Sequence, residues 1–401
     1  MSTTPSYKIA IIGSGPVSLT LAALLHSWSI PFTIYEASPS IRHAGGSLDL
    51  HPSTGQQALR EAGLYPAFLQ YARPECDVLK LVDAKTGEVV WDENGADGSA
   101  GDAGNHERPE IDRARLVQIL HESLPEGKIA FGKKLVRAEQ APSAAQGGKA
   151  TYDLYFADGS SETGVDVLVG GDGAWSVVRR LLSEQKPQYA GISALEIWIN
   201  DVEANAWAKQ YVGAGSLFAF SEGLAVQCQR QGDGSLRSYA SLRVPEDFFE
   251  TCGIDWTKPD EARTQWVDKY FNSISPDLQR LVKESVDNAI PRKMYELPVG
   301  WRWPSRSGVT LIGDAAHVMT PFAGVGVNVG MTDALVLARE IRKVWEGEKG
   351  VDEALQAYET EMFPRAEGNA AKTARNKVGH FSDGGSRHMA AKIKERRAGG
   401  N

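Results

Sequence analysis

The stretch that most constrains the fold of this chain lies near its start, between Lys8 and Glu36. Its pattern predicts a buried strand, a glycine-rich turn, a helix and a second strand, in that order. These segments are Lys8–Ile12, Gly13–Ser18, Leu19–Trp28 and Pro31–Tyr35. Two apolar strands joined through a helix favour a βαβ unit, so we expect a doubly wound, mainly parallel sheet.

The turn of this unit, the first loop (Gly13–Ser18), has the composition of a dinucleotide-binding loop. Glycines let the backbone approach a pyrophosphate at a helix N-terminus, and Glu36 can accept hydrogen bonds from ribose hydroxyls. Ser18 replaces the third glycine, which we expect to loosen the helix packing slightly. Because Glu36 is an acid, we expect FAD or NAD as the resident ligand, not NADP. The predicted cofactor-binding residues are Gly13, Gly15, Pro16, Val17 and Glu36.

A second stretch of the same kind runs from Val309 to Asn328. An apolar run ends in Gly313-Asp314, glycines follow, and helical periodicity resumes near Asn328. A helix N-terminus presents unpaired N–H groups and partial positive charge, which suit an anion or an electron-rich carbonyl. We call this the third loop (Gly313–Asn328). An ordinary strand-to-helix connection capped by Asp314 fits the same pattern.

Another strand-to-helix turn lies between these two stretches and follows the apolar run Val165–Val169. We call it the second loop (Gly170–Arg179). It contains Gly171-Asp172-Gly173, so Asp172 either serves a cofactor or caps the turn. Arg179 and Arg180 at its end are either phosphate contacts or solvated.

The length and charge of the chain bound its class. With 401 residues it exceeds one typical core, so two domains are expected. A net charge of −8 argues against general binding to nucleic acids or anionic membranes. Cys76, Cys228 and Cys252 lie far apart, which suggests neither a disulfide framework nor a metal site. The polar start and the lack of long apolar runs predict a cytoplasmic protein without a signal peptide or membrane insertion.

From Pro187 to Ile290 short strands separated by glycine-rich turns dominate. An antiparallel sheet inserted into a nucleotide-binding domain explains this composition, and its inward face would form a substrate wall. We therefore expect an α/β fold: a Rossmann-like FAD-binding domain with an inserted antiparallel-sheet substrate domain and a C-terminal helix. The expected ranges are 1–74, 107–186 and 291–345 for the first, 75–106 and 187–290 for the second, 346–380 for a bridging helix and 381–401 for a flexible tail.

From Lys8 to about Val378 the three loops resemble those of the single-component FAD-dependent aromatic hydroxylases, the class A flavoprotein monooxygenases with the GR2-type FAD domain. Within that family the chain is most similar to the tetracycline-inactivating flavin monooxygenases, through Gly46–His51, Pro109–Arg113 and Pro321–Asn328. The resemblance implies that Glu36 holds the adenosine ribose and Asp314 the ribityl chain. It also places further residues near the flavin: Asp49, Arg113, Asp172, Pro321, Gly324, Val325, Gly326 and Val327.

The substrate pocket departs from that group. Thr320 and Val325 replace its Pro and Gln. In the middle strands an approximate alignment puts Ser216, Gln227 and Arg237 where it uses an Arg, a Phe and a His, and Glu196 where it uses a Gln. The flavin residues therefore carry over and the tetracycline pocket does not. The predicted substrate residues are Glu196, Ser216, Gln227, Arg237 and Phe322.

The resemblance implies that NADPH reduces FAD, that O₂ adds to give a C4a-hydroperoxide, and that hydroxyl passes to an electron-rich polycyclic phenol or enol, as in secondary metabolism or tetracycline resistance. Phe322 and Gly324 would border the ring, and no side chain is assigned as a certain catalyst.

NADPH would dock transiently near Arg113 and Asp172. The alternatives are a flavin reductase or dehydrogenase, a non-catalytic flavin protein and, from Trp301–Pro304, a halogenase. We expect a monomer.

Overall fold

The computed structural model describes residues 7–42, 45–95, 107–142 and 150–398. A parallel sheet in the order β17-β11-β1-β2-β7 forms its nucleotide-binding part. Its strands are β1 (Ile9–Ile12), β2 (Thr33–Tyr35), β7 (Ile129–Ala130), β11 (Val167–Gly170) and β17 (Val309–Leu311). All residues of β1, β11 and β17 are buried, as expected for short apolar strands covered on both faces.

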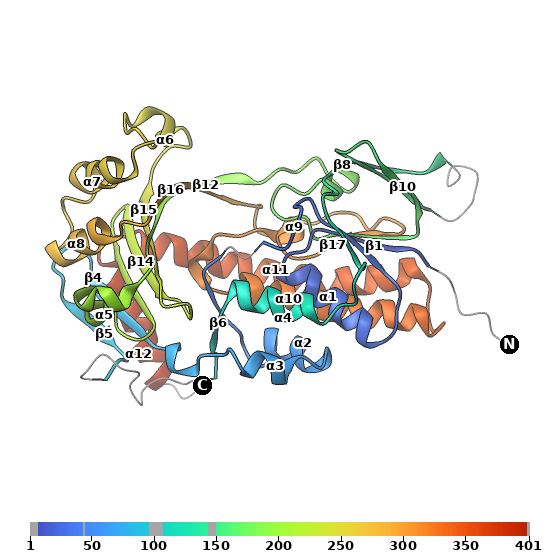
Figure 1. Cartoon of the computed structure of the whole chain (residues 1–401), viewed down its shortest axis with the longest axis horizontal. Coiled ribbons are helices and arrows are strands. Elements are labelled where there is room, and N and C mark those ends of the chain that lie inside the picture. The colour runs from blue at the N-terminus through green and yellow to red at the C-terminus, as the bar shows by residue number, and fades with distance from the viewer. Residues whose placement is uncertain (1–6, 43–44, 96–106, 143–149, 399–401) are drawn as a thin grey trace.

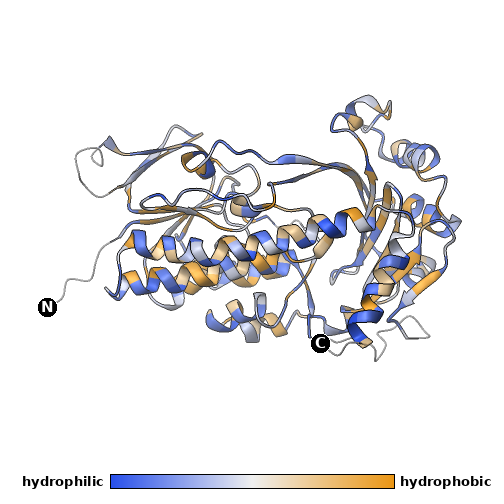
Figure 2. Ribbon diagram, turned by 180° about the vertical axis from the view of Figure 1, so that it is seen from behind, coloured by the Kyte–Doolittle hydropathy of each residue, from blue (hydrophilic) through white to orange (hydrophobic). Residues whose placement is uncertain are grey.

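Helices complete the core around this sheet. Buried side chains of the strands and of the helices form one continuous apolar cluster. The helices are α1 (Pro16–Ser27), α4 (Arg113–Glu122), α10 (Gly326–Trp345) and α11 (Val351–His380). In both views α10 and α11 run side by side along the molecule (Figures 1 and 2). Pro364 lies inside α11, which continues through it as one helix.

A second, seven-stranded sheet has the order β16-β12-β15-β14-β13-β4-β5, antiparallel except between β13 and β4. Its strands are β4 (Leu79–Asp83), β5 (Val89–Asp92), β12 (Gln188–Ile199), β13 (Ser216–Ser221), β14 (Leu224–Arg230), β15 (Leu236–Arg243) and β16 (Asn288–Glu296). One face packs on α5 (Ala206–Val212), α7 (Pro259–Tyr270) and α8 (Pro276–Glu284) through a separate apolar cluster. The expected antiparallel sheet is therefore present, and β16 crosses the predicted boundary at residue 290.

The remaining elements are smaller. A two-stranded ribbon pairs β3 (Ser47–Asp49) with β6 (Glu110–Asp112). The others are α2 (Gly55–Glu61), α3 (Tyr65–Leu69), α6 (Phe248–Thr251), α9 (Asp314–His317), a sheet of β8 (Leu135–Gln140), β9 (Tyr152–Phe156) and β10 (Ser161–Val165), and the 3₁₀ turns η1 (Pro74–Cys76), η3 (Val178–Leu181), η4 (Val202–Ala204) and η5 (Pro321–Ala323).

The end of the chain differs from the expected flexible tail. Residues Gly385–Ala398 form the helix α12, which packs on β4, β5 and β13 (Figures 1 and 2). Its anchor is Ser386, fully buried, whose hydroxyl donates to the carbonyl of Val82 at 2.7 Å. A polar anchor of this kind leaves no apolar pattern in the sequence, and so the basic composition alone pointed to a tail.

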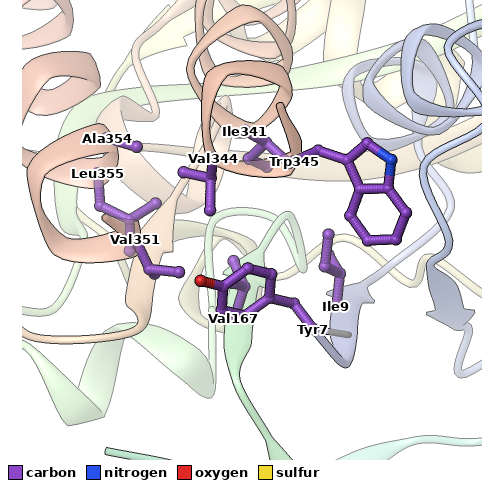
Figure 3. Close-up of a pocket in the computed structure, with 9 residues that line it drawn as sticks. All are labelled: Tyr7, Ile9, Val167, Ile341, Val344, Trp345, Val351, Ala354 and Leu355. Carbon is purple, nitrogen blue, oxygen red and sulfur yellow. The ribbon is translucent and has the colours of Figure 1, made fainter. Parts of the chain in front are cut away.

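A small apolar gap lies between β1, β11 and the facing ends of α10 and α11 (Figure 3). Its volume of about 10 Å³ leaves room for about one water molecule, and its lining includes Ile9, Val167 and Trp345. We interpret it as imperfect packing between layers. Among the described residues, none of the helices is both long and apolar enough to cross a bilayer.

Candidate active site

The first loop leaves β1 with a backbone that favours glycine. Gly13 has φ of 93°, and a Cβ there would lie 2.6 Å from the carbonyl oxygen of Gly171 in the second loop. Gly15 is the N-cap residue of α1, and Pro16 occupies the first turn, where its missing N–H costs nothing. The N-terminus of α1 therefore opens toward the loop, as required to hold a pyrophosphate.

Glu36 follows β2 directly and is almost fully buried. The backbone N–H and the hydroxyl of Ser14 both donate to its Oε2 at 2.7 Å, and the N–H of Ser38 donates to Oε1 at 2.8 Å. Burial raises the pKa of Glu36, but these hydrogen bonds outweigh burial and bring the pKa below its ordinary value. Glu36 is thus a fixed carboxylate beside the first loop, the group that ribose hydroxyls require.

The three loops converge. Val17 packs on the third loop, since a Cβ at Gly313 would lie 3.2 Å from a methyl group of Val17. Ser18 packs on the second, and its hydroxyl lies 2.1 Å from where a Cβ of Gly171 would stand. The second and third loops are joined by Arg179, whose Nη1 donates to the carbonyl of Ala315 at 2.9 Å. The serine in place of the third glycine is therefore accommodated by a glycine in the neighbouring loop.

In the second loop, Asp172 turns inward. Its Oδ1 accepts from the hydroxyl of Ser176 at 2.5 Å, and its Oδ2 accepts from the N–H of Val177 at 2.7 Å. Burial raises the pKa of Asp172, although these hydrogen bonds oppose the rise. The geometry matches the capping alternative. A direct role of Asp172 toward FAD or NADPH stays a prediction.

Asp314, unlike Asp172, has an exposed carboxylate. It is exposed at the first position of α9, and none of the described residues forms a hydrogen bond or ion pair with its carboxylate. Beneath it His317 is buried and paired with Asp333, so its ring serves the structure of the loop. An unpaired carboxylate where three glycine loops meet suits the hydroxyls of a flavin side chain.

The predicted border of the flavin ring is formed by η5 and the start of α10. Gly324 has φ of 64°, in the left-handed region, and ends η5. Gly326 and Val327 then begin α10, and their N–H groups belong to the helix N-terminus with no partner inside the helix. Val325 is its N-cap residue. Donors at such a position stabilise negative charge.

Asp49 ends β3 beside this border, and Arg113 follows β6 at the start of α4. The Oδ1 atom of Asp49 lies 4.0 Å from where a Cβ of Gly324 would stand, and Nε2 of His51 lies 3.0 Å from Oδ2. Arg113 begins α4 against Gly45, and its exposed guanidinium forms no hydrogen bond or ion pair within the described ranges. Within the described residues Arg113 is thus free to meet a ligand, whereas Oδ2 of Asp49 also lies 3.7 Å from Nη1 of Arg108.

Two positioning residues lay outside the sequence prediction. Asn328 in α10 donates to the carbonyl of Asp49 at 2.8 Å and accepts from the N–H of His51 at 2.9 Å, so it locks β3 to the third loop. Arg73 donates to Asp112 at 2.7 Å and to the hydroxyl of Ser47 at 3.0 Å, which ties both strands of the ribbon. Asn328 belongs to the segment Pro321–Asn328 that carries the resemblance, but nothing in its spacing indicates these partners.

The predicted substrate residues share one region. Strand register places Glu196 opposite Tyr239, Trp198 opposite Arg237, and Gln227 opposite Tyr239. Arg237 donates to Glu196 in a buried ion pair. Ser216 and Gln227 belong to the same sheet face through the pairing of β13 with β14. This face is turned away from α7 and α8, whose cluster takes the alternate residues of each strand.

Phe322 connects this sheet to the flavin border. It lies in η5, is 4% exposed, and packs in a third apolar cluster with Ile192, Phe220, Ala225 and Phe381. The Phe322 and Phe381 rings meet edge to face with centroids 5.3 Å apart. The structure therefore brings a predicted ring-border residue against the predicted substrate wall.

A parallel nucleotide-binding sheet, three converging glycine loops and a facing antiparallel sheet define the class of FAD-dependent aromatic hydroxylases. The residues present fit FAD: a fixed carboxylate for the ribose, an unpaired one at Asp314, and two helix N-termini for negative charge. Within the described residues, no group of three or more His, Cys, Asp and Glu side chains could hold a metal ion.

Comparison with known proteins agrees with this class. The FAD binding domain family matches residues 6–373, and the chain belongs to this family. It is 32% identical to the monooxygenase penA of Penicillium thymicola, over 97% of this chain and 99% of that protein. It is also 32% identical to the monooxygenase asqM of Emericella nidulans, over 96% and 98%. The protein is thus an FAD-dependent monooxygenase.

Solved structures share the fold. HpxO of Klebsiella pneumoniae, in complex with FAD and uric acid, has a TM-score of 0.76 at 20% identity, covering 98% of this chain and 94% of that chain. The tetracycline destructase Tet(55) has a TM-score of 0.70 at 17% identity, covering 95% and 92%. The expected likeness to both groups is therefore present at the level of fold.

Proposed function

We propose that this enzyme uses NADPH and O₂ to hydroxylate an electron-rich carbon of a small polycyclic phenol or enol held between FAD and the seven-stranded sheet. The observation that carries the proposal is the third cluster, in which Phe322 of the flavin border belongs to one buried apolar group with Phe220 and Ala225 of that sheet. A substrate on this face would lie beside the ring.

When bound, FAD supplies the redox and oxygen chemistry. The N–H groups at Gly326 and Val327 would stabilise negative charge on the reduced cofactor. Asp314 and Glu36 would hold its hydroxyls, and the exposed Arg113 would meet the nicotinamide nucleotide. The buried rings of Phe322 and Phe381 would exclude water, which favours transfer of oxygen to substrate over its release as peroxide.

The substrate itself is proposed on chemistry, not on fold. Glu196, Arg237, Gln227 and Ser216 provide donors and acceptors suited to hydroxyl and carbonyl groups of a fused-ring compound. Tetracyclines belong to that class, as do hydroxylated quinones. We also propose that the enzyme acts as a cytoplasmic monomer, which light scattering after size-exclusion chromatography would test.

The test is a screen of the holoenzyme for substrate-dependent NADPH and NADH consumption, with mass spectrometry for the gain of one oxygen atom. Tetracyclines, hydroxyanthraquinones and simple phenols form the panel. An oxygenated product from a fused-ring phenol or enol, at a rate greater with NADPH than with NADH, is expected. Rapid NADPH consumption without an oxygenated product from any compound would instead establish a flavin reductase.

Phe322→Ala supplies a matched variant for the same screen. Opening the wall beside the ring should raise the share of NADPH that ends as hydrogen peroxide, while bound FAD stays constant. Phe248→Ala, on the far side of the seven-stranded sheet, is the control, since Phe248 packs with Trp266 and Tyr270 away from the flavin. Equal peroxide yields from both variants would contradict a role of Phe322 in excluding water.

A further inference from the structure

A charged cluster with more cation than anion lies on the face of the seven-stranded sheet that is turned toward the flavin border. Glu196 is 1% exposed and accepts from Arg237 through one oxygen. Through the other it accepts from Nε of Arg292 at 2.6 Å. The indole N–H of Trp198 also donates to this carboxylate at 3.3 Å. One carboxylate thus faces two guanidinium groups, and Arg237 is itself buried.

Strand register builds this cluster. The pairing of β12 with β15 sets Trp198 opposite Arg237 and Tyr239 opposite Glu196. The guanidinium carbon of Arg237 lies 4.8 Å from the centroid of the Trp198 ring and 5.6 Å from that of Tyr239. Arg292 approaches from β16, the neighbouring edge strand. Two flat rings therefore hold the guanidinium in place.

Arg237 has donors left over. Its Nε and Nη1 atoms are buried, yet neither has a hydrogen-bond partner among the described residues. A buried donor without an acceptor is costly, more so when the group is charged. Arg237 is only 7% exposed, so bulk water does not meet this need. An acceptor from outside the chain is the simplest remedy.

The free donors lie where a substrate would lie. Nη1 of Arg237 is 3.6 Å, and Cδ 3.4 Å, from where a Cβ of Gly46 would stand, and Oε1 of Gln229 is 3.9 Å from the same point. Gly46 precedes β3, the strand that ends in Asp49 at the predicted flavin ring. Arg237 therefore spans from the substrate wall to the ribbon beside the cofactor.

We propose that Arg237 selects substrates that carry an organic oxyanion, an ionised enol or phenol or a ring carboxylate, and that Glu196 limits the strength of this selection. A neutral acceptor would satisfy the hydrogen bonds but leave the excess positive charge, whereas an oxyanion satisfies both. The planar guanidinium matches an enolate or a carboxylate through two parallel hydrogen bonds. The inference rests on the proposed function for the location of the substrate and adds its ionisation state.

The test compares matched ligands by calorimetric titration of oxidised holoenzyme at pH 7, without NADPH. The probes are 2-hydroxy-1,4-naphthoquinone, an ionised enol; its neutral methyl ether; and 2-naphthoate, a carboxylate. The enolate should bind at least about 10-fold more tightly than the ether, the range of hydrogen bonds to a charged group. Tighter binding of 2-naphthoate than of the enolate would assign the oxyanion as a carboxylate.

Three variants should change enolate binding in different directions. Arg237→Gln should weaken enolate binding about 10- to 100-fold and change ether binding little. Glu196→Gln should tighten enolate binding, because it removes the opposing negative charge. Arg292→Gln should weaken it less than Arg237→Gln does, because the Arg292 side chain is 51% exposed and its charge is screened by water. If Arg237→Gln does not retain FAD, enolate and ether binding are compared in Arg237→Lys and Glu196→Gln instead.

Several results would overturn the inference: equal binding of enolate and ether, equal weakening of both by Arg237→Gln, weaker enolate binding in Glu196→Gln, or no binding of either anion at millimolar concentration. Because binding is measured without turnover, the two proposals fail separately. Selective binding with no oxygenated product in the screen would refute only the proposed function. An oxygenated neutral substrate with unselective binding would refute only the role of Arg237.

Discussion

Nε2 of His317 lies 2.5 Å from Oδ2 of Asp333 in the core beneath the third loop. The same oxygen accepts from the N–H of Gly313 at 3.0 Å, and Oδ1 accepts from Nη2 of Arg365 at 3.1 Å. Burial lowers the pKa of His317, but the Asp333 carboxylate outweighs it and raises the pKa above its ordinary value. One side chain of α10 therefore fixes the loop that carries Asp314 and pins it to α11.

Asp333→Asn should be strongly destabilising. Asp333 is fully buried, and its loss leaves His317 without its partner and Arg365 with only the exposed Glu361. Breaking a buried ion pair from one side costs about 3 to 5 kcal/mol. FAD affinity should also fall, because Gly313 loses its anchor. Urea unfolding of the apoprotein and fluorescence titration with FAD measure the two effects.

Glu361→Gln is the matched control, since Glu361 pairs with the same arginine at 3.0 Å but its side chain is 58% exposed. An exposed pair contributes about 0 to 1 kcal/mol, so this variant should resemble the wild type. Equal losses in the two variants would mean that the Asp333 network does not hold the third loop.

Asp314→Ala should separate cofactor binding from stability. Its carboxylate is exposed and unpaired within the described residues, so the apoprotein should unfold within about 0.5 kcal/mol of the wild type. FAD affinity should fall about 10- to 100-fold through the loss of charged hydrogen bonds. The flavin content after purification and a titration with FAD give the answer. An unchanged flavin content would refute the assignment of the third loop.

Asp172→Ala should show the contrasting behaviour. Its carboxylate caps the turn that enters η3, and the loss of such a cap costs about 1 to 2 kcal/mol. FAD affinity should change less than in Asp314→Ala. A variant that loses FAD while keeping its full stability would instead restore the direct cofactor role predicted for Asp172.

The first loop and Glu36 could be predicted because their signal is local. Strand, turn, helix and acid follow each other within one βαβ unit, and each has its own sequence pattern. The resemblance placed residues of all three loops at one flavin, and the loops do converge, because the carboxyl ends of parallel strands meet at one edge of a sheet. What the sequence did not reveal was the contact of Ser18 with Gly171, which is made across two loops far apart in the chain.

The substrate wall shows the opposite case. The resemblance predicts Glu196 and Arg237 as separate substrate residues, but their ion pair depends on the register of β12 against β15. A shift of one residue in the pairing of β15 with β12 would put the two side chains on opposite faces of the sheet. Register is set by packing across the whole sheet, and no local pattern contains it. The same holds for Asn328, whose partners lie about 280 positions earlier in the chain.

Glu110 should make stability depend on pH near neutrality. Burial raises its pKa from an ordinary 4.5 to about 7, against the hydrogen bond from Ser47. The folded state therefore holds this proton more tightly than the unfolded state, and the resulting stability is lost as pH rises from about 4.5 through 7. The difference corresponds to about 3 kcal/mol at most.

Glu110→Gln keeps the acceptor for Ser47 and removes the titration. The variant should lose less stability than the wild type between pH 5 and 8, as followed by urea unfolding of the apoprotein. Parallel curves for the two proteins across this range would show that Glu110 is ionised in the folded state at every pH tested.

Ser386→Ala should loosen α12 from the seven-stranded sheet. The Ser386 hydroxyl accepts from the N–H of Phe220 at 2.8 Å and donates to the carbonyl of Val82 at 2.7 Å. Removing it leaves two buried backbone groups unsatisfied, at a cost of about 1 to 3 kcal/mol. Limited trypsin digestion should then cut faster at the arginines of α12.

Ser382→Ala is the control, because its hydroxyl donates to the carbonyl of Gly379 in the last turn of α11. Equal, rapid cleavage of all three proteins would show that α12 is not held on the sheet, in keeping with the tail expected from composition.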